Sequence, residues 1–138
     1  MRNPELAIDY VRRASTRLKA PDVYVTAESW ADVVRESQEA VELALKGLLR
    51  ACEVQPPRIH DVSDILLAER ERLPATLSDA VDELVTISRR LRRDRELAFD
   101  GAQDLTPSRF YSRADAEKAR NGARRVMELV SPHVLEQE

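Results

Sequence analysis

The chain has 138 residues, the size of one domain, with 43% apolar residues, 34% charged residues and a net charge of −3. This balanced composition argues against a disordered chain, and it argues against binding of nucleic acid by bulk positive charge. No apolar run approaches the roughly 20 residues that span a bilayer, and a lone Cys52 excludes an internal disulfide. We expect a single soluble domain over residues 1–138, located in the cytoplasm.

Apolar residues recur at every third or fourth position, which predicts helices rather than strands. The first predicted helix covers residues 5–19 and ends at Ala20-Pro21. The second covers residues 29–52 and is the longest amphipathic segment. Its apolar stripe contains Trp30, Val34, Ser37, Val41, Ala44, Leu48 and Cys52.

Prolines and capping residues separate the remaining helices. Residues 53–61 form a loop that contains Pro56-Pro57, after which Asp61 or Ser63 can cap a short helix. Pro74 opens a fourth helix that stops at Asp100-Gly101. Its stripe contains Leu77, Val81, Leu84, Ile87, Leu91 and Ala98.

A last helix follows Ser112 and Asp115, which have the spacing of a capping box, and Ser131-Pro132 should bend or end it. The sequence therefore predicts an all-α, up-and-down bundle of four to five helices with short connections.

Several kinds of active site are absent from the sequence. The three glycines cannot form a P-loop or a dinucleotide fingerprint. Cys52, His60 and His133 are too few and too scattered for a zinc site, and no Glu-x-x-His pair supports a di-iron site. We expect no metal and no cofactor. A catalytic triad assembled from distant positions stays open.

One charged segment, RRLRRDRE at residues 89–96, stands out. At 100° per residue, Arg89, Arg90 and Arg93 point away from the apolar stripe, and we expect them to face solvent. Arg95 lies 18 residues after Leu77, which places it on the stripe itself.

Arg92 lies at the flank of the same stripe. An arginine on the apolar face near a helix end, as predicted for Arg95, needs a carboxylate, a cluster of carbonyls or a bound anion. A salt bridge to Glu42 or to an aspartate and a ligand site are both open, and the residues alone favour the salt bridge.

Five segments occur in an order that resembles HEPN-domain proteins, small helical bundles. They are LAIDYVRRA (6–14), SQEAVELALKGLLRACEV (37–54), PPRIHDVSDIL (56–66), RRDRELAFDG (92–101) and FYSRADAEKARNGA (110–123). The resemblance implies a homodimer with an anion-binding groove where the fourth helices meet. Many members are metal-independent ribonucleases, often toxins, encoded beside a minimal nucleotidyltransferase.

The ribonuclease motif of that family is an Arg followed, after four to six residues, by a His. In the matching stretch, Arg95 is followed after four residues by Asp100, whose ionised carboxylate would repel a phosphate. No arginine precedes His60 or His133 at the motif spacing. We therefore assign no catalytic residue, and we expect His60 to cap or pack at the short helix. The candidate binding residues are Arg92, Arg95, Glu96, Asp100, Gly101, His60 and Asp61.

The leading expectation is a HEPN-like module that binds a nucleotide, RNA or a minimal nucleotidyltransferase, with catalysis doubtful because of Asp100. An active metal-independent endoribonuclease toxin is the first alternative, and a non-catalytic dimerisation module is the second. We also expect a homodimer, because a chain with few aromatic residues can use them for pairing. The residues considered for this surface are Tyr24, Trp30, Phe99, Phe110 and Tyr111.

Overall fold

The computed structural model describes residues 4–56, 58, 61–99 and 110–135, without the side chains of residues 95–99. Two 3-10 helices, η1 (Arg70–Arg72) and η2 (Ala75–Ala80), accompany the α-helices, and no strand occurs in these ranges. The predicted all-α fold class is confirmed. The α-helices are α1 (Pro4–Arg17), α2 (Ala20–Thr26), α3 (Trp30–Ala51), α4 (Val62–Ala68), α5 (Val81–Phe99) and α7 (Arg113–Val134).

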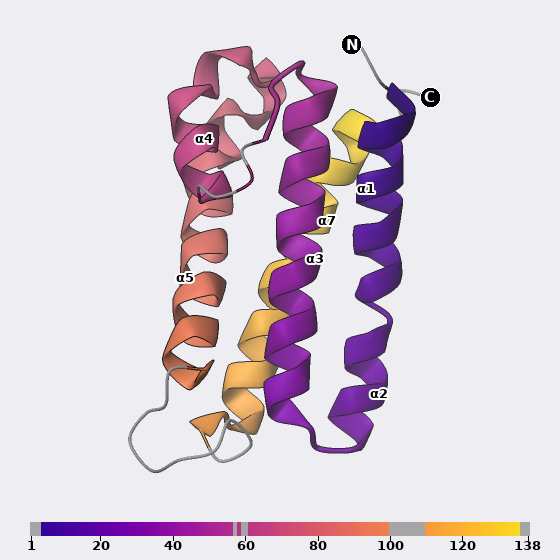
Figure 1. The fold of residues 1–138 in the computed structure, drawn as a ribbon, viewed down its shortest axis with the longest axis vertical. Coiled ribbons are helices and arrows are strands. Elements are labelled where there is room, and N and C mark those ends of the chain that lie inside the picture. Colours follow the sequence, from indigo (N-terminus) through magenta and orange to yellow (C-terminus); the bar gives the residue numbers. More distant parts are fainter. Residues whose placement is uncertain (1–3, 57, 59–60, 100–109, 136–138) are drawn as a thin grey trace.

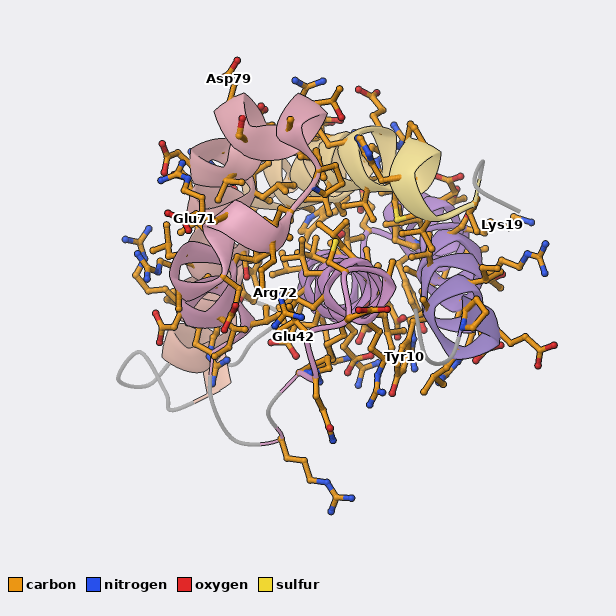
Figure 2. The ribbon with its side chains drawn as sticks, turned by 90° about the horizontal axis from the view of Figure 1, so that it is seen from above. Tyr10, Lys19, Glu42, Glu71, Arg72 and Asp79 are labelled. Carbon is orange, nitrogen blue, oxygen red and sulfur yellow. The ribbon has the colours of Figure 1, made fainter. Side chains whose placement is uncertain are left out.

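Helix α3 is the centre of the bundle. Figure 1 shows α1 and α2 descending beside it, α5 descending on its other side, and α7 returning behind it toward the end where both chain termini lie. Seen along the bundle, α3 has α1, α5 and α7 on three sides (Figure 2). Its most extensive packing is against α1 and α7.

This central position explains why α3 buries more than the predicted stripe. Besides Val34, Val41, Ala44 and Leu48, it buries residues on the neighbouring faces, including Leu45 and Leu49. Gly47 is part of this wider face, because a Cβ there would lie 2.7 Å from Val11 Cγ2. A glycine at position 47 therefore allows α1 to approach α3 closely.

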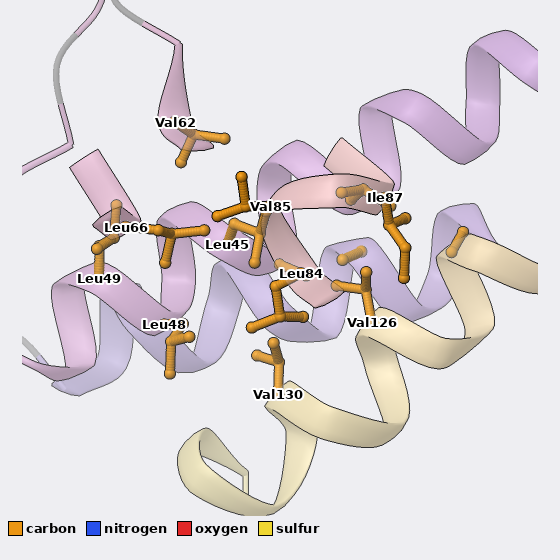
Figure 3. Packing of buried hydrophobic residues seen from close by; sticks show 14 of the residues in the cluster. Leu45, Leu48, Leu49, Val62, Leu66, Leu84, Val85, Ile87, Val126 and Val130 are labelled. Atoms are coloured by element: carbon orange, nitrogen blue, oxygen red, sulfur yellow. The ribbon is translucent and has the colours of Figure 1, made fainter. Parts of the chain in front are cut away.

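The core is aliphatic, and every long helix contributes to it (Figure 3). Leu84 of α5 lies beside Val126 and Val130 of α7 in the close-up. The largest fully buried side chains are Leu45, Leu48, Leu49, Leu66, Leu77, Leu84 and Leu91. Burial of this kind contributes roughly 1.5–3 kcal/mol for each leucine relative to an exposed position.

The first helix ends two residues before its predicted end at Lys19, and a helix after it was missed. Helix α1 ends at Arg17, and α2 begins at Ala20 with Pro21 in its first turn. Proline is well suited to this position, because the first N–H groups of a helix have no partner within it. Leu18 and Lys19 thus separate the two helices, and Ala20-Pro21 begins the second of them.

Two further boundaries differ from the prediction. Pro74 precedes the 3-10 helix η2, and the α-helical part of the fourth helix begins only at Val81. Helix α7 starts at the predicted capping box of Ser112 and Asp115 and continues through Pro132 to Val134. Pro132 removes one backbone hydrogen bond near the end of α7, and the helix continues for only two residues beyond it. The stop predicted at Asp100-Gly101 lies outside the described residues.

Some of the aromatic residues predicted for a pairing surface are packed within the chain itself. Tyr111 is 7% exposed and meets Phe110 edge to face, with ring centroids 5.1 Å apart. Trp30 is partly buried and carries the guanidinium of Arg113 over its ring at 5.0 Å. Tyr111 therefore offers no surface for pairing, and the homodimer stays a prediction.

No described helix is both long enough and apolar enough to cross a bilayer.

Candidate functional site

The structure describes only part of the predicted binding residues. Arg92 and Asp61 are described in full. Arg95 and Glu96 lie within α5, but their side chains are outside the described part. His60, Asp100 and Gly101 also lie outside the described residues. The geometry of the site therefore comes from Arg92, Asp61 and the residues around them.

Arg92 connects α5 to two other elements. Its Nη1 lies 3.8 Å from Glu42 Oε1 on α3 and 3.8 Å from Asp61 Oδ1 at the start of α4. The sequence predicted Glu42 or an aspartate as the partner of an arginine on the apolar face, and Arg92 lies near both Glu42 and Asp61. The side chain of Arg92 is 36% exposed, so part of its guanidinium faces solvent.

Hydrogen bonds from the first turn of α4 fix the orientation of the Asp61 side chain. It has extended backbone angles, and its Oδ1 accepts hydrogen bonds of 2.9 Å from both the backbone N–H and the hydroxyl of Ser63. Of the two predicted caps, Asp61 and Ser63, it is Asp61 that caps α4. A capping carboxylate is stabilised by the positive end of the helix dipole as well as by its hydrogen bonds. Arg92 thus meets a carboxylate that is already held in place.

Arg89 differs from its expected role as a solvated residue. Its Nε donates to Ser63 Oγ at 3.1 Å and its Nη2 donates to Asp64 Oδ1 at 2.7 Å. The side chain is 49% exposed, but it fixes α5 to α4. Because Ser63 Oγ also donates to Asp61, Arg89, Ser63, Asp61 and Arg92 form one connected network.

Gln38 completes the network from α3 and was not assigned to the site from the sequence. It is 4% exposed, and its Nε2 donates to Glu42 Oε1 at 2.7 Å. The same oxygen faces Arg92. The available signal was the spacing of Gln38 and Glu42, because residues four apart in a helix lie next to each other. Figure 2 places Glu42 on the side of α3 that no long helix covers.

Tyr111 anchors this half of α5 to the start of α7. Its hydroxyl donates to the backbone carbonyl of Asp94 at 2.5 Å. Asp94 lies one residue before Arg95, so the bond fixes the backbone that carries the arginines. The sequence analysis placed Tyr111 at a pairing surface and did not foresee this contact.

The positive and negative charges of the described side chains around Arg89 and Arg92 nearly balance. Glu42, Asp61 and Asp64 face Arg89 and Arg92, which leaves one negative charge in excess. A phosphate would bind Arg92 by replacing one of these carboxylates. The contacts of Arg92 with Glu42 and Asp61, at 3.8 Å, are longer than a hydrogen bond, so a phosphate that hydrogen-bonds to Arg92 can replace a carboxylate.

No group of three potential metal ligands occurs among the described His, Cys, Asp and Glu residues.

One of three comparisons with known proteins gives a match. A family model described as HEPN domain matches residues 7–134. Searches among curated proteins and among solved structures found no match. The match to the family model contains all the helices that form the site.

Proposed function

Because the chain belongs to the HEPN-domain family, we propose that it is a module that binds the phosphates of a nucleotide or RNA through the Arg92 and Arg95 end of α5. One observation carries the proposal most directly: Arg92 is oriented by two elements and still partly exposed. A guanidinium held in this way loses little conformational entropy when it binds an oxyanion.

Phosphate is a suitable replacement for the carboxylates that face Arg92. Arginine binds phosphate through two parallel charge-assisted hydrogen bonds, which are stronger than neutral ones. The ion pairs of Arg92 are partly exposed, and exposed pairs contribute only about 0–1 kcal/mol. A phosphate that forms shorter bonds would therefore compete well with Glu42.

We propose that the module lacks ribonuclease activity. General acid–base cleavage of RNA needs a group whose pKa lies near neutral pH, and histidine is the usual one. At the motif position the chain has Asp100, an ordinary acid that is ionised at neutral pH. An active metal-independent endoribonuclease is the alternative, and it would require a base other than the motif histidine.

The proposed partners follow from the family. We propose a homodimer and a minimal nucleotidyltransferase encoded as part of a toxin–antitoxin system. A non-catalytic dimerisation module is the second alternative, and the two carboxylates beside Arg92 favour it, since they can satisfy the guanidinium without a ligand.

The test is a titration of a short fluorescein-labelled single-stranded RNA followed by fluorescence anisotropy. Arg92→Gln and Arg95→Gln should each weaken binding by about tenfold or more, as expected for losing a charged hydrogen bond. Arg13→Gln on α1 removes the same charge at an exposed position and is the matched control. Equal affinities for all four proteins would contradict the proposal.

The same RNA, incubated with the protein in EDTA, tests the catalytic alternative. Intact RNA after prolonged incubation agrees with a binding module. Cleavage that persists in EDTA and is lost in Arg95→Gln would establish the ribonuclease instead.

A further inference from the structure

A groove on the opposite side of α5 is independent of the site above. Arg90 precedes Arg92 by two residues, which separates them by about 200° around the helix. Arg90 lines a groove of about 750 Å³ between α5 and α7. Pockets for small ligands commonly measure about 300–1,000 Å³. Arg90 was expected to face solvent, but it is only half exposed.

The floor of the groove is formed by Ile87 and Gly122, where α5 packs against α7. Ile87 of α5 and Gly122 of α7 are both buried. A Cβ on Gly122 would lie 3.2 Å from Ile87 Cγ2 and 3.4 Å from Arg90 Nη2. The guanidinium of Arg90 therefore lies across the backbone of α7 at the glycine, beside an apolar floor.

One end of the groove is closed by an ion pair. Arg125 donates to both carboxylate oxygens of Glu83, from Nε at 2.9 Å and from Nη2 at 3.2 Å. Asp82, at the same end, pairs with Arg70 at 3.1 Å. The carboxylates at this end are thus neutralised by cations and do not repel an anion strongly.

The other end has cations without partners. Within the described part of the chain, Arg90 and Lys118 have no ion pair, no hydrogen bond and no aromatic contact. Asn121, which also lines the groove, has a free amide donor there. Glu117 is the one groove carboxylate that no described cation neutralises. Arg90 and Lys118 against Glu117 therefore leave a net positive charge among the unpaired groups at this end of the groove.

We propose that this groove is a second ligand site, which binds a small phosphorylated molecule with its phosphates between Arg90 and Lys118. A half-buried guanidinium without a partner is costly, and a phosphate supplies the oxygens that would satisfy it. The apolar floor at Ile87 and Gly122 can hold the rest of the molecule. This inference goes beyond the proposed function, because it concerns a different face of α5.

The test is isothermal titration calorimetry of the full chain with ATP, inorganic pyrophosphate and adenosine. ATP and pyrophosphate should bind and adenosine should not. A higher affinity for ATP than for pyrophosphate would show that the ligand is a nucleotide. Equal affinities for the two would show that the groove recognises the phosphates alone. Arg90→Gln and Lys118→Gln should each weaken ATP binding by about tenfold or more.

Two controls make the test specific. Glu117→Gln should strengthen ATP binding, because it removes the neighbouring carboxylate, and Arg13→Gln should leave it unchanged. Thermal melts of each variant show whether it is folded. The proposal is overturned if neither phosphate probe binds, if adenosine binds as well as ATP, or if an acidic polyglutamate peptide binds in place of the phosphates. Loss of ATP binding in Arg92→Gln, with Arg90→Gln unaffected, would also overturn it and would assign the nucleotide to the other face.

Discussion

The hydroxyl of Tyr111 donates a hydrogen bond to the backbone carbonyl of Asp94 and so joins the residues that precede α7 to the arginine-bearing half of α5. Tyr111 is 7% exposed, and the bond itself is partly buried. Helix α5 thus has two kinds of support at this end. Tyr111 fixes its backbone, while Glu42 and Asp61 orient the side chain of Arg92.

Tyr111→Phe should lower the free energy of unfolding by about 1 kcal/mol, because it removes one hydrogen bond and keeps the packing of the ring. Urea denaturation measures this change. Tyr24→Phe is the control, since Tyr24 is only partly buried and has no hydrogen bond from its side chain within the described residues. Equal losses in the two variants would contradict the role of the Tyr111 hydroxyl.

Two substitutions at Asp61 should separate its cap from its charge. Asp61→Ala removes the cap of α4 and should cost about 0.5–2 kcal/mol of stability. Asp61→Asn keeps an oxygen that can accept from Ser63 and should cost much less, although it removes the charge that faces Arg92. If denaturation shows the two variants to be equally destabilised, the charge pair and not the cap stabilises this turn.

The two buried helical glycines should respond differently to alanine. A Cβ at position 47 would lie 2.7 Å from Val11 Cγ2 and 3.0 Å from the backbone oxygen of Ala7. We expect Gly47→Ala to destabilise the fold by about 1–3 kcal/mol through overpacking, despite the better helix propensity of alanine.

At position 122 the nearest atoms belong to the side chains of Ile87 and Arg90, at 3.2 and 3.4 Å, and these can shift. Gly122→Ala should therefore be close to neutral, because a propensity gain of about 1 kcal/mol offsets the tighter contact. Chemical denaturation of both variants tests the comparison. A larger loss at position 122 than at position 47 would contradict the packing described for α1 and α3.

Glu83 should make a small contribution to the pH dependence of stability. The hydrogen bonds from Arg125 lower the pKa of the Glu83 carboxyl below its usual value of 4.5. A lowered folded-state pKa means that the stabilisation is present above about pH 4.5 and is lost as the pH falls through the folded value.

Glu83→Gln should consequently be less stable than the parent at pH 7, and the difference should shrink in acid. Denaturation curves at pH 7 and pH 3 measure it. A difference that stays constant between the two pH values would show that the ion pair is not its source.

The bundle could be predicted because its helices carry periodic apolar residues and strong local caps. Asp61 and the pair Ser112 and Asp115 satisfy backbone N–H groups within three residues, so their role is visible in the sequence. Helix α2 was missed because its seven residues are too few to show a period, and because Pro21 can either end one helix or begin the next.

The site was predicted less completely, because its contacts depend on which helices lie side by side. The angles of residues around a helix, at 100° per residue, place Arg92 at the flank of the apolar stripe, and its side chain is partly exposed. They do not show that Arg89 contacts Asp64, because that contact depends on the packing of α4 on α5. Likewise, Arg90 lies against Gly122 because α7 follows the other side of α5. A helical angle shows the direction of a side chain, and the neighbouring helix decides whether it meets solvent, a carboxylate or a groove.

The exchange of a carboxylate for a phosphate at Arg92 is the central claim of the proposed function. Its most direct test is the RNA affinity of Glu42→Gln, measured by anisotropy beside Glu71→Gln, which removes the same charge from an exposed position on η1. If RNA phosphate replaces Glu42 at Arg92, Glu42→Gln should bind RNA more tightly than the parent and more tightly than Glu71→Gln. An affinity of Glu42→Gln equal to that of Glu71→Gln, or weaker, would show that Arg92 and Glu42 form a structural pair and not a phosphate site.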